Sequence, residues 1–134
     1  MIPDNLILRI KSKLESAGTG IPVVEGLRSD DLPAPCIAVH AQSAENFNKG
    51  FTDVYRGMVS CRYDAHYADS NSSVVQQNFQ LLMDQFNSDN LSAELDGYGY
   101  KCFRASVEQA TSEIINDFFS NEILLEIIYE RETN

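Results

Sequence analysis

Alternating apolar and polar positions along the chain predict two long β-strands. In residues 55–67, apolar or small side chains occupy every second position, and the residues between them are polar except Met58. This pattern is typical of an antiparallel strand with one buried face. Residues 122–130 place aliphatic side chains and Tyr129 on one face and three glutamates on the other. They predict a second strand of the same kind.

Two shorter segments show the same alternation and complete a predicted sheet of four strands. In residues 36–41, Ile37 and Val39 share one face. Residues 102–108 alternate in the same way, and residues 21–27 are compatible with a short extended piece. The predicted apolar face of the segment 102–108 consists of Phe103, Ala105 and Val107.

Turn-forming and polar residues separate these strands. Residues 28–35 contain two prolines and two aspartates, and residues 46–53 are mostly polar and contain a glycine. Both segments are predicted loops. Asp96-Gly97 predicts a turn before the third strand. Residues 110–121 are predicted as a connector that leads into the last strand.

Apolar residues at helical spacing predict two amphipathic helices. The first spans residues 3–17 and ends at Gly18, and two lysines in its last turns complement the helix dipole. The second runs from the capping residues 70–73 to about Asn87. The predicted apolar stripes are Leu6, Ile10, Leu14 and Ala17 in the first helix and Val75, Phe79, Leu82 and Phe86 in the second.

The predicted elements follow the order helix, strand, strand, helix, strand, strand. The length of 134 residues fits a single domain, residues 1–134. We therefore expect an α+β fold of two layers, in which a mostly antiparallel four-stranded sheet has helices packed on one face.

The net charge of the chain argues against one class of function, tight binding of nucleic acid. Twenty acidic and ten basic residues give a formal net charge of -10, which opposes broad neutralisation of phosphates and hence tight nucleic-acid binding. Residues 64–99 contain no lysine or arginine. Such a run usually forms a solvated face. In a ring of identical subunits it would instead line an acidic lumen through which DNA passes without specific binding.

Localisation and cysteine usage follow from simple patterns. No stretch approaches the roughly 18 consecutive apolar residues of a membrane span, and residues 1–4 show no secretory signal pattern. We therefore expect a protein that is made and kept in a cytoplasm, without membrane contact. Cys36, Cys61 and Cys102 are widely spaced and form no CxxC motif, which favours reduced, structural thiols.

No pattern of residues supports catalysis. Asp64, His66 and Asp69 are conceivable metal ligands, but a polar, outward-facing side of the strand explains them more simply. The Gly-rich residues 18–20 follow a helix instead of preceding one, so they are interpreted as a helix stop and not as a phosphate loop. Neither a GxSxG nor an HExxH motif is present. We expect no metal, no cofactor and no enzymatic activity.

Four phenylalanines are candidate contact residues for an oligomer or another partner. Phe47 and Phe51 flank a polar pair in a predicted loop, and Phe118 and Phe119 are adjacent in the predicted connector. Aromatic side chains exposed in loops often mark protein contacts. The alternative is that these rings fold back and cover the ends of the sheet.

The whole arrangement resembles the tail-terminator proteins of long-tailed phages. The resemblance spans nearly the full chain and is carried by the element order, the proline-rich residues 32–35 before a hydrophobic strand, the long loop 46–53 and the last strand, 123–129. It implies a homohexameric ring that caps the tail tube and offers a surface to the head connector. It implies a location in the tail or neck of a virion assembled in a host cytoplasm, and no catalytic residues.

Two alternatives remain open. One is a neighbouring structural protein of the same particle, such as a head-completion, neck or minor capsid protein. The other is a cytoplasmic α+β module that binds a small ligand or a peptide on the exposed sheet. In that module Arg56, Arg62 and Arg104, on strands that would need to adjoin, would contact an anion.

Overall fold

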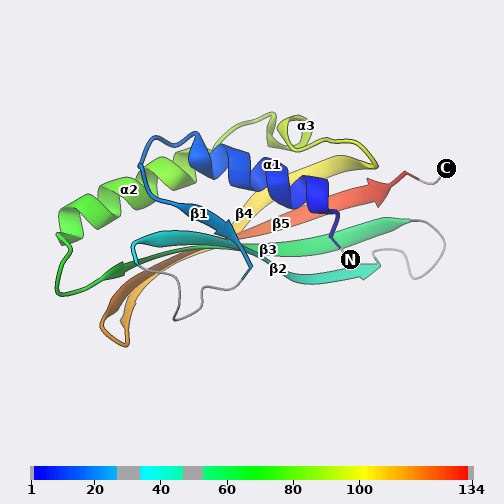
Figure 1. The fold of residues 1–134 in the computed structure, drawn as a ribbon. Helices are drawn as coiled ribbons and strands as arrows, with labels where there is room; N and C mark the ends of the chain where they lie inside the picture. The colour runs from blue at the N-terminus through cyan, green and yellow to red at the C-terminus, as the bar shows by residue number, and fades with distance from the viewer. Residues whose placement is uncertain (1, 27–33, 47–52, 133–134) are drawn as a thin grey trace.

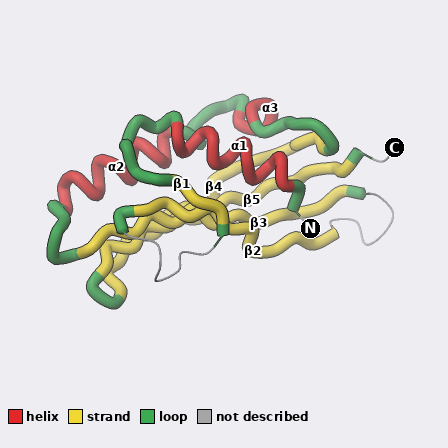
Figure 2. The backbone as a smooth tube through the Cα atoms, viewed as in Figure 1, coloured by secondary structure: helices red, strands yellow, loops and turns green. Residues whose placement is uncertain are grey.

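The computed structural model describes residues 2–26, 34–46 and 53–132. It consists of a sheet and a layer of helices on one face of that sheet (Figures 1 and 2). The helices are α1 (Asp4–Glu15), α2 (Ser72–Asp84) and α3 (Leu91–Glu94). The strands are β1 (Val23–Glu25), β2 (Cys36–Asn46), β3 (Val54–His66), β4 (Tyr100–Ile115) and β5 (Phe118–Arg131).

The sheet is mixed and has one strand more than the sequence predicted. Its five strands lie in the order β1-β2-β3-β5-β4. β1 pairs in parallel with β2, Val23 opposite Ile37, and the other three pairings are antiparallel. The α+β class is confirmed, and the four-stranded sheet is wrong. The additional strand comes from the segment 21–27, and its three residues are too few to show a periodicity.

The structure also corrects the predicted connector, residues 110–121. This segment forms the ends of β4 and β5 and the turn that joins them, not a separate linking segment. The turn residues Asn116 and Asp117 have φ of 49° and 67°. Positive φ at both central positions is typical of a type I′ hairpin turn, and Asn and Asp tolerate that conformation better than most residues.

Two other strand ends differ from the predictions. β2 continues to Asn46, which had been predicted as the first residue of the loop 46–53. Residues 47–52 of that loop lie outside the described part of the chain. β3 ends at His66. Tyr67, predicted on the buried face, therefore lies in the following turn and is 53% exposed.

A β-bulge overturns the predicted orientation of Phe103. The register of β4 against β5 shifts between Cys102 and Arg104, so Cys102 faces Tyr129 while Phe103 is left without a partner in the ladder. A bulge inserts one residue and reverses the alternation beyond it. Cys102 is consequently buried and Phe103 is half exposed, the reverse of the prediction.

The helices begin where capping and apolar spacing predict. Asn71 caps α2, since its side-chain oxygen accepts a hydrogen bond of 2.9 Å from the backbone N–H of Ser73. The predicted stripes of α1 and α2 face the sheet and are buried with the inner side chains of β3 and β5. Gly57 lies beneath Ile2 and the ring of Tyr129, where an added Cβ would come within 3.2 Å of both.

The inner face of β5 is the centre of the core. Leu125 and Ile127 have no exposed surface. We expect Ile127→Ala to lower the free energy of unfolding by about 2–5 kcal/mol, because it removes buried methyl groups and leaves a cavity. Urea denaturation measures this change. Ile114→Ala is the control, since Ile114 is 60% exposed and its truncation should change stability by about 0.5 kcal/mol or less. Equal effects of both variants would contradict this core.

All three cysteines are free and buried. Burial raises the pKa of Cys61, and it raises the pKa of Cys102 to about 11, with a smaller contribution from the charge of Asp96. A thiol reacts as its thiolate. At pH 8, folded Cys102 should therefore be alkylated about a hundredfold more slowly than in the unfolded chain. Iodoacetamide labelling followed by mass spectrometry, with and without urea, measures the ratio. Rapid labelling of the folded protein would contradict burial of this thiol.

Candidate interaction surfaces

The three residues considered as metal ligands, Asp64, His66 and Asp69, are not gathered into a metal-binding cluster in the described part of the chain. Within residues 2–26, 34–46 and 53–132, no group of three or more His, Cys, Asp or Glu side chains is placed to hold a metal ion. Asp64 lies on the same face as Arg62, as predicted, but it is buried, and its carboxylate lies 3.1 Å from the guanidinium of Arg62. The ring of His66 packs against Phe118 at 4.7 Å instead. No helix of the described residues has the length and apolarity needed to cross a membrane.

The sheet face opposite the helices carries a network of ion pairs. Arg56 pairs with Glu126 at 2.7 Å and with Glu45 at 3.3 Å. The hydrogen bond from Arg56 to Glu126 is the main reason that the pKa of Arg56 is raised. Ser60 donates a hydrogen bond of 2.7 Å to Glu122. The charges on this face are thus neutralised largely within the chain.

The three arginines considered for anion binding do not converge. Arg56 and Arg62 lie on β3, whereas Arg104 lies on β4, and β5 separates the two strands. The adjacency that the anion-binding alternative would need is therefore absent. Arg56 and Arg62 are also already paired with carboxylates. The arrangement offers no cluster of free cations for a bound anion.

The hairpin that links β4 to β5 is the second surface of interest, and we call residues 110–121 the hairpin arm. It curves away from the helix layer (Figure 1). As a result, Ile114 is 60% exposed and Ile115 is 37% exposed. They point to opposite faces because they are consecutive in a strand. The arm thus exposes apolar side chains on both faces.

Of the four phenylalanines predicted as contact residues, the structure describes two. Phe47 and Phe51 lie outside the described residues. Phe118 and Phe119 open β5 at the base of the turn and are partly buried, and the ring of Phe119 lies 5.0 Å from that of Tyr67. The structure brings these two rings together with the two isoleucines of the arm. Sequence reasoning missed the isoleucines, although Ile114 and Ile115 stand out as adjacent apolar residues in a polar stretch.

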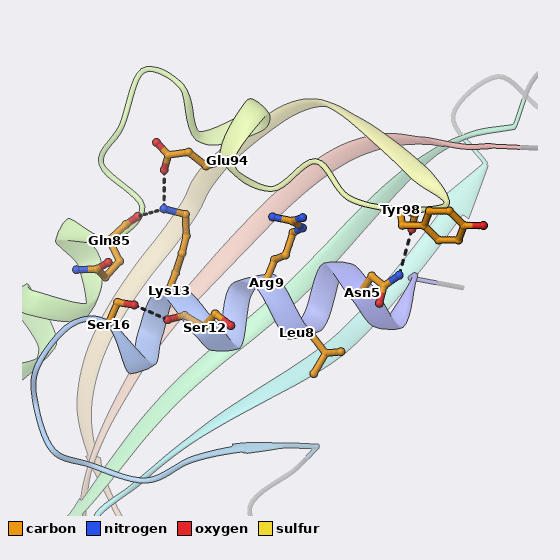
Figure 3. A pocket seen from close by; sticks show the side chains of 9 residues that line it. All are labelled: Asn5, Leu8, Arg9, Ser12, Lys13, Ser16, Gln85, Glu94 and Tyr98. Atoms are coloured by element: carbon orange, nitrogen blue, oxygen red, sulfur yellow. Dashed lines mark hydrogen bonds and ion pairs between the residues drawn. The ribbon is translucent and has the colours of Figure 1, made fainter.

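A groove of about 720 Å³ runs along α1, where α1 faces the loops that flank α3 (Figure 3). Its apolar parts are Leu8, 46% exposed, and Tyr98, 84% exposed. At one end Asn5 donates a hydrogen bond of 3.1 Å to the carbonyl oxygen of Tyr98. The full lining is Asn5, Leu8, Arg9, Ser12, Lys13, Ser16, Gln85, Glu94 and Tyr98.

The two cations of this groove differ in their partners. Lys13 donates hydrogen bonds to Glu94 and to the carbonyl oxygen of Gln85, and the bond from Lys13 is the main reason that the pKa of Glu94 is lowered. Arg9 lies between the two ends of the groove (Figure 3). In the described part of the chain it has neither a hydrogen bond nor an ion pair. Its charge opposes the effect of burial, which raises the pKa of Tyr100 to about 12.

Comparison with known proteins shows similarity in fold only. The sequence matches no family model, and no curated protein matches it. A chain in the solved structure described as "Virion of native gene transfer agent (GTA) particle" is similar, with 11% identity and a TM-score of 0.59, over 92% of this chain and 89% of that chain. A second solved chain has 18% identity and a TM-score of 0.60, over 100% of this chain and 99% of its own. At these identities the similarity shows a shared fold.

Arg62 tests the ion-pair network on the uncovered face. In Arg62→Glu, a second carboxylate would face buried Asp64, and the hydrogen bond of 3.0 Å to Ser120 would be lost. We expect a loss of about 1–2 kcal/mol in the free energy of unfolding, measured by urea denaturation. Arg104→Glu is the matched control on the neighbouring part of the same face and should change stability by about 0.5 kcal/mol or less. Unchanged stability of the Arg62 variant would argue against the network.

Proposed function

We propose that this protein is a structural component of a phage-like virion, and specifically a tail terminator that caps the tail tube as a hexameric ring. The observation that carries the proposal is the fold shared with a chain of a gene transfer agent virion over nearly the full length of both chains. The proposal agrees with the resemblance to tail terminators in element order and loop placement. Tail tube protein and head connector are the partners that this role implies.

The described surfaces suit a ring subunit. A ring of identical copies requires two different surfaces on each copy that fit one another. The hairpin arm supplies exposed apolar side chains at one end of the sheet. Phe118 and Phe119 directly follow the turn at the tip of this arm, and we assign them to the contact between copies.

The charge distribution fits the passage of DNA through such a ring. The segment 64–99, which includes α2 and α3, lacks lysine and arginine. Its acidic residues Asp69, Asp84, Asp89 and Glu94 are exposed. A lumen lined by these carboxylates would repel phosphates, so a duplex would pass without specific binding.

Two other roles are less well supported. A neighbouring head-completion, neck or minor capsid protein would share the virion location and differ in its partners, and the fold comparison is compatible with it. An anion-binding module is disfavoured by the pairing of Arg56 and Arg62 with carboxylates of the same chain.

The oligomeric state tests the proposal directly. We expect light scattering over a concentration series, with millimolar Mg²⁺ to screen the net charge of -10, to detect a species of about six subunits. Negative-stain images should show rings. Addition to growing tail tubes should stop their elongation. A monomer that also fails to bind tube ends would contradict the terminator role.

Phe118 tests the assigned contact. Phe118→Asp should weaken self-association at least about tenfold, because it places a charge in an apolar contact, while circular dichroism shows the fold unchanged. Leu81→Asp is the matched control, since Leu81 is an exposed apolar residue of α2, 41% exposed and away from the arm. Ring formation by both variants would show that the contact lies elsewhere. Loss of the ring in both would show a general effect of added negative charge.

A further inference from the structure

The hairpin arm and the α1 groove lie too far apart to meet within one copy. The arm contains the last residues of β4, among them Glu113, Ile114 and Ile115, and Tyr98 of the groove lies two residues before the start of β4. β4 has 16 residues, so its ends are about 50 Å apart at the rise of an extended strand. Figure 1 shows the hairpin between β4 and β5 at one end of the sheet and the N-terminal end of α1 toward the other. Any contact between them therefore joins two copies.

The charges of the hairpin arm and of the α1 groove are complementary. Glu113 and Asp117 of the arm are exposed, and residues 105–130 contain no lysine or arginine. The groove contains Arg9, whose guanidinium has no hydrogen-bonding partner in the described part of the chain. α1 carries Arg9, Lys11 and Lys13, three of the ten basic residues of this acidic chain. Arg9 can therefore donate hydrogen bonds to a carboxylate that approaches from another copy.

Their apolar surfaces are complementary as well. The arm exposes Ile114 and Ile115 beside its carboxylates, and the groove exposes Leu8 and Tyr98. An exposed tyrosine ring and a guanidinium are the side chains that contribute most often to the energy of protein contacts. Apolar burial would exclude water around the charged hydrogen bonds and strengthen them.

We propose that the hairpin arm of one copy docks in the α1 groove of the next copy. Glu113 and Asp117 of the first copy accept hydrogen bonds from Arg9 of the second, and Ile114 and Ile115 pack against Leu8 and Tyr98. Such a contact is heterologous, because the two copies use different surfaces, and repetition of it closes a ring. This inference rests on the proposed ring and names the surfaces that form it.

Two variants, each defective at one of the two surfaces, test the contact. Arg9→Glu disables the groove and leaves the arm intact. Glu113→Gln with Asp117→Asn disables the arm and leaves the groove intact, and a neutral arm does not pair with the acidic groove of the first variant. Each variant alone should be monomeric by light scattering, with self-association weakened at least about tenfold. An equimolar mixture should form a dimer of twice the 15.0 kDa subunit mass, because only one arm and one groove remain functional.

Controls separate this contact from general effects of charge and stability. Lys11→Glu changes the same charge on the same helix outside the groove lining, and it should leave the ring intact. Arg9→Gln removes the charge with less risk to folding and should also weaken association. Circular dichroism and thermal unfolding check that each variant is folded.

The outcomes distinguish this inference from the proposed function. If the parent forms rings and Arg9→Glu does too, the docking contact is overturned and the ring stands. If both variants are monomeric but their mixture is also monomeric, the pairing of arm with groove is overturned. If the parent forms no ring in solution or on tube ends, the proposed function fails, and the contact fails with it.

Discussion

The pairing of β3 with β5 is the constraint on which the rest of the structure depends. The two strands pair in register from Val54 opposite Glu130 to His66 opposite Phe118. Opposite residues share a face, so the two alternating patterns coincide. Their aliphatic side chains form one surface, which α1 and α2 cover, and their charged side chains meet on the other in pairs such as Arg56 with Glu126. A shift by one residue would exchange the two faces.

The exposed arm follows from the different lengths of helices and strands. A helix rises about 1.5 Å per residue and a strand about 3.3 Å. The 12 residues of α1 therefore span about 18 Å, whereas the 16 residues of β4 span about 53 Å. Helices of this length cannot cover the whole sheet. Ile114 and Ile115 remain exposed at its far end, and such apolar side chains gain free energy when another surface covers them.

Elements with a regular spacing of apolar residues could be predicted from the sequence, whereas features that interrupt such a spacing could not. Both main helices, the central strand and the last strand were predicted because each shows its period over several turns or alternations. β1 is too short to show one. The bulge at Phe103 reverses the alternation, and the hairpin turn at Asn116 lacks a glycine, so neither carries its usual signal. The groove joins residues from α1 to Tyr98, and no local pattern connects positions so far apart in the chain.

Net charge and local charge act in opposite directions on assembly. Copies that each carry a charge of -10 repel one another at long range, and this repulsion is screened beyond about 8 Å at physiological ionic strength. A short contact between a carboxylate and a guanidinium is screened much less when apolar side chains surround it. Moderate salt therefore weakens the long-range repulsion between copies more than it weakens the attraction within the contact. In the proposed contact, Arg9 would then determine which surface of one copy the acidic arm of another approaches, and so the orientation of neighbouring subunits.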